Sequence, residues 1–384
     1  MGRSQPRTDW GHLLASSRRL HARSAIPVAT PSLEDPLRRE VPRARILSLG
    51  AGVQSTTLLL LSAKGEIEPF DAAIFADTGW EPRAVYEHLD RLERQVAGPA
   101  GIPIARVSYG NLREDSLSGD HTVVLPLFTK KDDGTTAMLS RQGTQNYKIL
   151  PIYRFVRRML GASETRSTCT SCQGSGRRLA PWRHAANTEP GVCSVCRGSG
   201  ERARIGSVPP HSGWVEMSIG FSTDEIVRVS PSRRKYAKNR FPLIELGWSR
   251  SDALDYLTAH GFPDTPRSAC VACPYHSQAE WTHLRESSPI EWEEAVAFDA
   301  AMRNAPGFSG GQIEAYVHRS CRPLSELRPT GQTDVQVPGC SPFGCRSGAE
   351  VDVRLEDELL NGDEMDIPMD HRRGRVIPMS QGRA

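Results

Sequence analysis

Residues 45–61 constrain this chain most, because they have the pattern of a buried strand, a glycine-rich turn and a helix in succession. The stretch opens with an apolar run of strand length, turns at Gly50-Ala51-Gly52, and from Ser55 is apolar over the length of a helix. Glycine lets a backbone approach a phosphate closely, and the helix N-terminus attracts negative charge. Ser55 suits the first turn, where its hydroxyl can donate to a phosphate oxygen. The stretch is therefore either a phosphate cradle or an ordinary strand-to-helix turn.

Two more strand patterns follow this turn. Residues 72–76 form a buried-type strand that ends at Asp77, and residues 102–107 form a third, with helical apolar spacing between the two. This order predicts an α/β fold with a doubly wound, mainly parallel, Rossmann-like sheet, whose ligands bind beyond the carboxyl ends of the strands. Asp77 falls at that edge and is expected to accept from a ribose hydroxyl or to help hold Mg²⁺, with a helix cap as its alternative role.

Length and charge set the broad class. The 384 residues are enough for one large α/β domain with additions, or for two domains. No apolar run approaches the length of a membrane span, and the N-terminus lacks the apolar core of a signal peptide, so we expect a cytoplasmic protein without a membrane partner. The net charge of +3 is too small to indicate nucleic acid by itself.

The predicted layout has five parts. They are a disordered basic arm (1–42), a nucleotide-binding core (43–162), an inserted zinc module (163–205), the remainder of the core with C-terminal helices and a cysteine cluster (206–346), and a disordered tail (347–384). The Arg-, Ser- and Pro-rich arm is either a solvated tail or a nucleic-acid contact. Within the core, Asp133-Gly134 indicates a hairpin turn.

Basic residues gather at two places in the core. Arg141 precedes an apolar-periodic helix and Lys148 stands at its start, where cations entering a cleft suit an anionic substrate. A dense basic run around Tyr236, residues 232–240, suits a nucleic-acid backbone or a nucleotide phosphate. A solvated basic surface is the alternative in both cases. Residues 242–246, just after this run, have the pattern of a strand.

A repeated cysteine motif predicts a zinc site. Two C-x-x-C-x-G-x-G units occupy residues 169–176 and 193–200. Each unit places two thiolates on one side of a tight turn, so two units complete a tetrahedral site with no open position, which indicates a structural role. The predicted ligands are Cys169, Cys172, Cys193 and Cys196. Arginines flank both units, so a contact with nucleic acid or protein is a secondary prediction.

A later pair, Cys270 and Cys273, is ambiguous between a redox pair, half of a zinc site and half of an iron–sulfur site. Cys340 and Cys345 lie in a Gly- and Pro-rich segment of the kind that folds back to complete a metal site. We therefore expect these four cysteines to form a second metal centre. Cys321 is expected to be a buried free thiol.

Four motifs stand in order along the core: Ser48-Leu-Gly-Ala-Gly-Val-Gln-Ser55, Phe75-Ala-Asp-Thr-Gly-Trp80, Arg141-Gln-Gly-Thr-Gln-Asn-Tyr-Lys-Ile-Leu-Pro151, and Cys270-Val-Ala-Cys-Pro274 with Trp281. Together they resemble the phosphoadenosine phosphosulfate (PAPS) reductase-like branch of the PP-loop, or adenine nucleotide α-hydrolase, superfamily. The inserted cysteine repeat resembles the zinc-binding repeats of DnaJ-type chaperones. Apart from that insertion, the resemblance covers roughly residues 45–345.

The resemblance implies an enzyme that binds ATP or PAPS. Members that use ATP split it into AMP and pyrophosphate while activating a substrate, often for sulfur transfer to a nucleotide or nucleic acid. It implies that Asp77 holds the ribose or Mg²⁺, that Arg141 and Lys148 hold the leaving anion, and that a sulfur-donor protein is a partner. The loop residues implied to bind the nucleotide are Ser48, Gly50, Gly52, Gln54 and Ser55. The second cysteine set is implied to hold an iron–sulfur cluster, with zinc as the alternative.

Three departures separate the chain from that family pattern. Val53-Gln54 replaces the usual Lys-Asp of the loop, Gly143 stands where many relatives have a cysteine, and a C-terminal Glu-Cys-Gly-Leu-His segment is missing. The last departure argues against a PAPS reductase proper. The alternatives to an ATP-cleaving enzyme are therefore a PAPS reductase and a non-catalytic module that binds nucleotides or nucleic acid.

Overall fold

The computed structural model describes residues 41–117, 125–139, 143–177, 192–193, 195–303 and 313–329, and the backbone of a short strand at residues 377–378. The predicted basic arm up to residue 40 and nearly all of the predicted tail lie outside the described residues. No helix in the described part of the chain is both long and apolar enough to cross a membrane.

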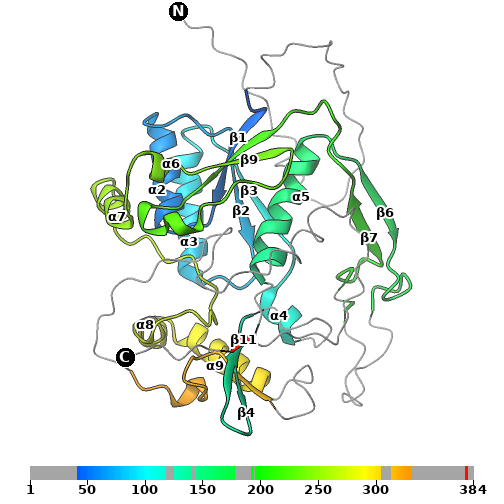
Figure 1. The fold of residues 1–384 in the computed structure, drawn as a ribbon, viewed down its shortest axis with the longest axis vertical. Coiled ribbons are helices and arrows are strands. Elements are labelled where there is room, and N and C mark those ends of the chain that lie inside the picture. The colour runs from blue at the N-terminus through cyan, green and yellow to red at the C-terminus, as the bar shows by residue number, and fades with distance from the viewer. Residues whose placement is uncertain are drawn as a thin grey trace, which may run out of the picture.

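The core is a five-stranded parallel sheet, in the order β3-β2-β1-β8-β9 (Figure 1). All four strand pairings are parallel, and β1 lies in the middle between β2 and β8. The strands are β1 (Ala44–Leu49), β2 (Ala72–Asp77), β3 (Ile104–Ser108), β8 (Val215–Ile219) and β9 (Ala237–Arg240). The prediction of an α/β fold with a parallel sheet is confirmed.

Alternation along the strands explains why helices cover both faces. In β1, Leu47 and Leu49 join one apolar cluster, whereas Ile46 joins another on the opposite face. The first cluster is covered by α2 (Val53–Lys64), α3 (Arg83–Leu92) and α7 (Arg250–Ala259), and the second by α5 (Leu150–Met159). These helices lie on the two sides of the sheet in Figure 1.

A second layer of structure stands beyond the sheet. A four-stranded sheet, β10-β4-β5-β11, packs with α4 and α9 and with α8 around Trp281 and Phe298. Its β4–β5 hairpin turns at Gly134, which has φ 82° and donates to the carbonyl of Lys131, so the predicted hairpin is confirmed. The elements are α4 (Leu112–Leu117), β4 (Phe128–Lys131), β5 (Thr136–Met138), α8 (Gln278–Ser287), α9 (Pro289–Arg303), β10 (Ile313–Tyr316) and β11 (Ile377–Pro378).

The strand pattern over residues 242–246 is wrong. Residues Pro242–Glu245 form the short helix α6, because Pro242 has no N–H to donate and its fixed φ suits a first helical position. The remaining short helical segments are η2 (Glu93–Ala97), η3 (Gln145–Ile149), η4 (Thr223–Arg228) and η6 (Leu324–Glu326).

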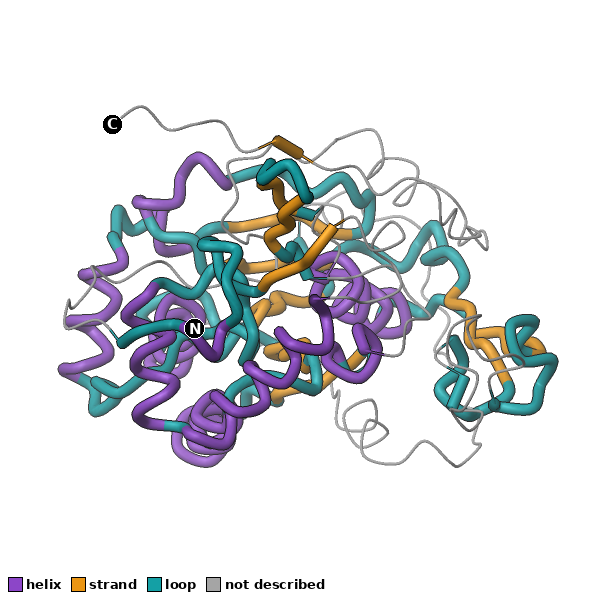
Figure 2. The backbone as a smooth tube through the Cα atoms, turned by 90° about the horizontal axis from the view of Figure 1, so that it is seen from below, coloured by secondary structure: helices purple, strands orange, loops and turns teal. Residues whose placement is uncertain are grey.

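The cysteine repeat forms a separate small unit between α5 and β8. Its stem is an antiparallel pair, β6 (Glu164–Thr168) and β7 (Glu201–Ile205). Figure 2 shows this unit standing at one end of the molecule, beside the α/β core. Arg157 of α5 fixes the stem by donating to the backbone carbonyls of Ile205 and Gly206.

Candidate nucleotide-binding edge and metal centre

The turn after β1 is held by Ser55. Its Oγ accepts a hydrogen bond from the backbone N–H of Gly50 at 3.1 Å and donates one to the carbonyl of Gly52 at 3.2 Å. Between them Ala51 has φ 54°, in the left-handed region that side chains disfavour and that recurs at ligand sites. The predicted phosphate donor therefore braces the turn, which sets the path of the loop into α2.

The N-terminus of α2 has no side-chain cap. Its N-cap is Gly52, and its first turn carries no acidic residue. The first N–H groups of a helix lack intrahelical acceptors, and together with the helix dipole they favour an anion. Gly220, just after β8, permits a close approach to this turn, since a Cβ there would stand 3.0 Å from the amide nitrogen of Ser55.

A buried polar cluster surrounds Gln54 in the first turn of α2. Its Nε2 donates to Glu225 Oε2 at 2.9 Å, and its Oε1 accepts from Arg250 Nη1 at 3.1 Å. Arg228 pairs with the same Glu225 carboxylate. Burial raises the pKa of Glu225, although both arginines oppose that shift, and burial lowers the pKa of Arg250. Gln54 therefore links Glu225, which pairs with Arg228, to Arg250 beside the open helix end.

Several donors at this edge find no acceptor within the described part of the chain. They are Arg228 Nε and Nη2, Arg250 Nε and the hydroxyl of Ser48, all shielded from solvent. Ser48 lies near the end of β1 and is 1% exposed. A buried donor without an acceptor costs about 1–3 kcal/mol. An anion would supply acceptors for the donors of Arg228 and Arg250, which are linked through Glu225 and Gln54.

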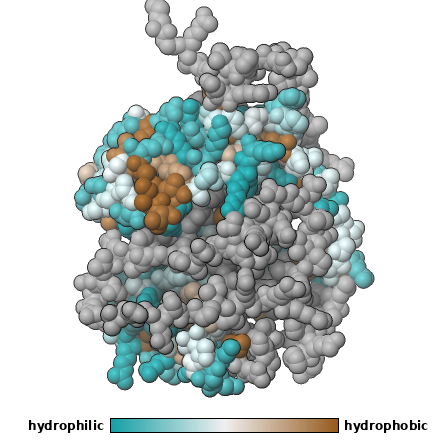
Figure 3. All heavy atoms as spheres, viewed as in Figure 1, coloured by the Kyte–Doolittle hydropathy of each residue, from teal (hydrophilic) through white to brown (hydrophobic). Residues whose placement is uncertain are grey.

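An apolar surface adjoins this cluster. Ile226, Val227 and Val229, on either side of Arg228, are 57%, 91% and 39% exposed. Figure 3 shows apolar side chains gathered over this part of the molecule. Exposed apolar side chains grouped beside a polar cluster mark a surface on which a substrate or partner can pack.

Asp77, at the end of β2, is used to form the next loop. Its Oδ1 accepts from the backbone N–H of Gly79 at 2.8 Å and from the hydroxyl of Tyr86 at 2.7 Å. Burial raises the pKa of Tyr86, and the Asp77 carboxylate raises it further. The first of these bonds is an Asx turn, so Asp77 fixes the loop and caps no helix.

Lys148 lies inside the protein and is paired. Its Nζ stands 3.2 Å from Glu81 Oε1, and the two side chains are 6% and 1% exposed. The same carboxylate oxygen accepts from the Thr78 hydroxyl at 3.1 Å and from the Cys270 thiol at 3.7 Å. Arg141, the other predicted cation, lies outside the described residues. The structure therefore places the predicted lysine in a buried network with a glutamate that the sequence did not single out.

The segment before Cys270 joins the two loops of the edge. A Cβ on Gly52 would stand 3.1 Å from Ser268 Cβ, so the turn after β1 touches this segment. Two residues later Cys270 contacts Thr78 and Glu81 of the loop after β2. The predicted site residues Gly52, Cys270 and Lys148 therefore belong to one contiguous edge.

The second predicted metal centre is described only in part. Cys270 and Cys273 are both buried and three residues apart on one turn, where the Cys273 N–H donates to the Cys270 carbonyl at 3.1 Å. Cys340 and Cys345 lie outside the described residues. Cys321 is buried, as expected, and its thiol donates to the carbonyl of Thr129.

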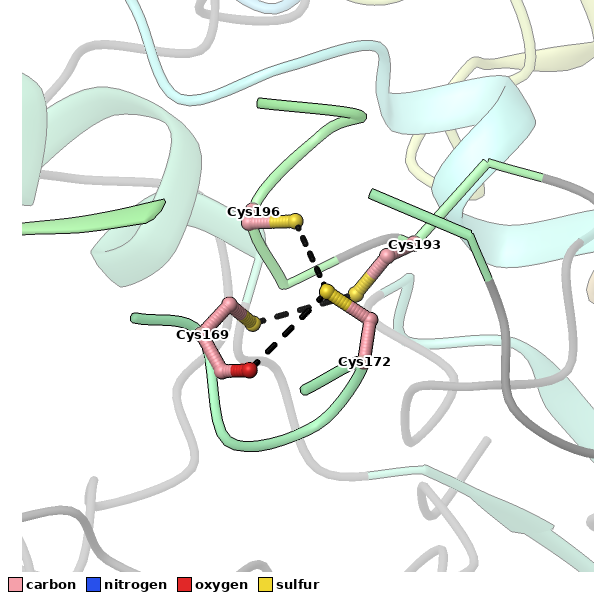
Figure 4. A group of neighbouring side chains, drawn as sticks. All are labelled: Cys169, Cys172, Cys193 and Cys196. Carbon is pink, nitrogen blue, oxygen red and sulfur yellow. Dashed lines mark hydrogen bonds between the residues drawn. The ribbon is translucent and has the colours of Figure 1, made fainter. Parts of the chain in front are cut away.

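The first cysteine set does come together. The four Sγ atoms of Cys169, Cys172, Cys193 and Cys196 all lie within 4.8 Å of one another (Figure 4). Two of the separations are 4.0 Å (Cys169 to Cys193) and 3.5 Å (Cys172 to Cys196). Tetrahedral Zn–S bonds of about 2.3 Å put the sulfurs about 3.8 Å apart. A buried set of four thiols with these separations can hold a metal ion such as zinc.

The glycines of the two units fit against each other's backbone. A Cβ on Gly176 would stand 2.3 Å from the carbonyl oxygen of Gly198, and a Cβ on Gly200 would stand 2.3 Å from that of Gly174. All four have φ between 70° and 82°. The glycines of the C-x-x-C-x-G-x-G motif therefore meet two requirements. They adopt the left-handed backbone of the turn, and they leave room for the backbone of the other unit.

The pKa values of two thiols in this set shift in opposite directions. Burial raises the pKa of Cys172, but hydrogen bonds from Cys196 and from the Gly176 backbone outweigh it and lower the pKa to about 7. Burial raises the pKa of Cys193 to about 12. Zinc binds the thiolate form of cysteine, so a lowered thiol pKa favours metal binding.

Part of the predicted basic surface is engaged within the fold. Arg234 stacks on Tyr153 at 3.6 Å, and Lys238 lies over Trp214 at 4.0 Å. Arg240 pairs with Glu245, Glu68 and Glu216. These three side chains make contacts within the fold. Fewer cations of residues 232–240 are therefore available to bind a phosphate backbone than the sequence suggests.

The search of protein-family models finds no match, and neither does the search of curated proteins.

Proposed function

We propose that this chain is a PP-loop, PAPS reductase-like enzyme that binds an adenine nucleotide at the carboxyl edge of its parallel sheet. Its reaction is the cleavage of ATP to AMP and pyrophosphate, which activates a substrate for sulfur transfer. The observation that carries the proposal is the uncapped N-terminus of α2 beside Arg228 and Arg250, since Arg228 Nε and Nη2 and Arg250 Nε are buried and lack acceptors in the described part. Parallel α/β sheets bind ligands at this edge.

The unpaired arginine donors favour phosphate oxygens as the missing acceptors. Arg228 and Arg250 lie beside two carboxylates, Glu225 and Asp224, so the argument rests on the N–H groups that lack acceptors in the described part and not on an excess of positive charge. Guanidinium groups bind phosphate through paired N–H donors, and fixed donors stabilise the charge that builds up during phosphate transfer. Ser48, Gly50 and Gly52 line the turn itself. Mg²⁺ would shield the phosphates, with the carboxylate of Asp77 as its predicted ligand.

The acceptor substrate in this proposal is a nucleotide or nucleic acid. The exposed apolar surface at Ile226 and Val227 adjoins the cluster and offers a base or a partner protein a packing face. The sulfur donor is a separate protein. The four-cysteine unit holds zinc in a structural role, and the set that includes Cys270 and Cys273 holds an iron–sulfur cluster or a second zinc.

One observation favours a non-catalytic nucleotide-binding module as the second candidate. The cation proposed for the leaving anion, Lys148, is neutralised by Glu81 within a buried network. The loop lysine of the resembled family is also replaced by Val53. A module with this edge would bind a nucleotide and leave it intact.

Nucleotide turnover by zinc-replete protein separates these proposals. ATP is incubated with protein and with candidate acceptors, and AMP, pyrophosphate and, for PAPS, sulfite are measured. The enzyme proposal predicts AMP and pyrophosphate in equal amounts, lost in Arg250→Ala and kept in Arg83→Ala. Arg83 is an exposed arginine that pairs with its helix neighbour Glu87. Sulfite from PAPS would instead establish the reductase, and binding without any product would establish the module.

A further inference from the structure

The two knuckles of the cysteine unit are nearly identical in sequence but differ where one of them faces the core. The residue after the second cysteine is Gln173 in the first unit and Arg197 in the second. Both have a left-handed backbone, with φ 50° and 53°. Gln173 is exposed, whereas Arg197 contacts the loop that follows β3. Metal binding does not need this difference, so it has another cause.

Arg197 is fitted into the core by charge and by shape. Its Nη2 donates to Asp115 Oδ2 at 3.0 Å, and its guanidinium lies 5.0 Å from the ring centre of Tyr109. A Cβ on Gly110 would fall 1.2 Å from Arg197 Nη1, so only glycine at position 110 leaves room for the guanidinium.

The contact continues into the nucleotide edge. The same Asp115 oxygen accepts from the hydroxyl of Tyr147 at 2.5 Å. Tyr147 is 2% exposed and directly precedes Lys148 in η3, and Lys148 pairs with Glu81. A continuous series of contacts therefore links Cys196 to Glu81. Arg197, the covalent neighbour of Cys196, and Tyr147 both donate to Asp115. Lys148, the covalent neighbour of Tyr147, forms an ion pair with Glu81.

We propose that Arg197 is a positioning residue, through which metal binding at the four cysteines sets the geometry of η3 and hence of Lys148 and Glu81 at the nucleotide edge. The metal fixes the knuckle, and the knuckle holds the guanidinium on Asp115. Asp115 then holds Tyr147, so the turn that carries Lys148 keeps one conformation. The consequence for ligand affinity rests on the proposed nucleotide site, whereas the structural link does not.

The test compares Arg197→Ala with Gln173→Ala, the matched position in the other knuckle. Zinc content, hydrogen exchange of residues 143–150 and ATP affinity are measured on the full chain. We expect both variants to keep one zinc in this unit. Arg197→Ala should exchange faster over 143–150 and bind ATP about fivefold more weakly, at the low end of typical coupling between sites. Gln173→Ala should match the parent protein.

Two further measurements separate the role of Arg197 from a general loss of stability. Gly110→Ala should reproduce the Arg197→Ala exchange pattern, because the methyl group displaces the guanidinium while the cysteines stay unchanged. Removing zinc with a chelator should speed exchange over 143–150 in the parent and add nothing in Arg197→Ala. Equal exchange in Arg197→Ala and Gln173→Ala would overturn the inference. A parent that binds no ATP would refute the proposed function alone, because the exchange result still decides the link.

Discussion

Replacing Gly200 with alanine should weaken zinc binding at the four-cysteine site, although all four cysteines remain. The added methyl would stand 2.3 Å from the carbonyl oxygen of Gly174, a backbone atom that cannot move aside as a side-chain tip can. The left-handed φ of 74° adds the usual penalty for a side chain, about 1–2 kcal/mol. Overpacking against a fixed neighbour costs about 1–3 kcal/mol more.

The sum, about 2–5 kcal/mol, corresponds to roughly 30-fold to 4,000-fold weaker zinc binding, because metal affinity and folding of the unit are the same free energy. Gly198→Ala is the matched control in the same unit, with φ 82°, and its added Cβ would meet a side-chain atom, Val192 Cγ1 at 3.3 Å, in place of a backbone carbonyl, so it reports mainly the backbone penalty. Zinc affinity is measured by competition with a chromophoric chelator under reducing conditions. A Gly200→Ala protein that binds zinc as tightly as Gly198→Ala would refute the packing account.

Three further predictions concern the core. Lys148→Met should lower the free energy of unfolding by about 3–5 kcal/mol, because Glu81 is then a buried carboxylate without its ion pair, and the double variant with Glu81→Gln should recover part of the loss in urea unfolding. Burial lowers the pKa of His88 to about 4 from an unfolded value of about 6.5, so the folded state favours the neutral ring. The contribution of His88 to the free energy of unfolding is therefore full above pH 6.5. The free energy of unfolding should fall by about 2 kcal/mol at pH 5, and this loss should be absent in His88→Gln. Chelation of zinc should increase hydrogen exchange in β6 and β7 and leave the exchange of β1 and β2 unchanged, and equal effects on both would contradict a separate unit.

The parts of the fold that could be predicted from sequence are those whose structure is determined by residues within one short segment. The run from residue 45 to 61 specifies a strand, a turn and a helix because apolar spacing and glycine act on neighbouring residues. The four-cysteine site follows from spacing for the same reason, since each knuckle is a single turn. The hairpin at Gly134 is equally local.

The missing parts depend on residues far apart in the sequence. Arg250 reaches Gln54 across 196 positions, and Glu81 meets Lys148 through the packing of two separate loops. Nothing local distinguishes these residues from solvated arginines and glutamates. Arg197 had a usable signal, its mismatch with Gln173 in the repeat. The strand pattern at residues 242–246 failed because a proline at the first helical position outweighed the three apolar residues that follow it, Leu243, Ile244 and Leu246.

The most direct measurement of the central claim is a calorimetric titration of ATP, and separately of PAPS, into reduced and metal-replete protein purified without oxygen. The account predicts one site per chain for an adenine nucleotide, with affinity lost by at least tenfold in Arg250→Ala and unchanged in Arg83→Ala. Preference for ATP supports the proposed cleavage chemistry, and preference for PAPS supports the reductase alternative. Binding of neither nucleotide, by protein that holds its zinc, would contradict the assignment of the α2 N-terminus as a phosphate site.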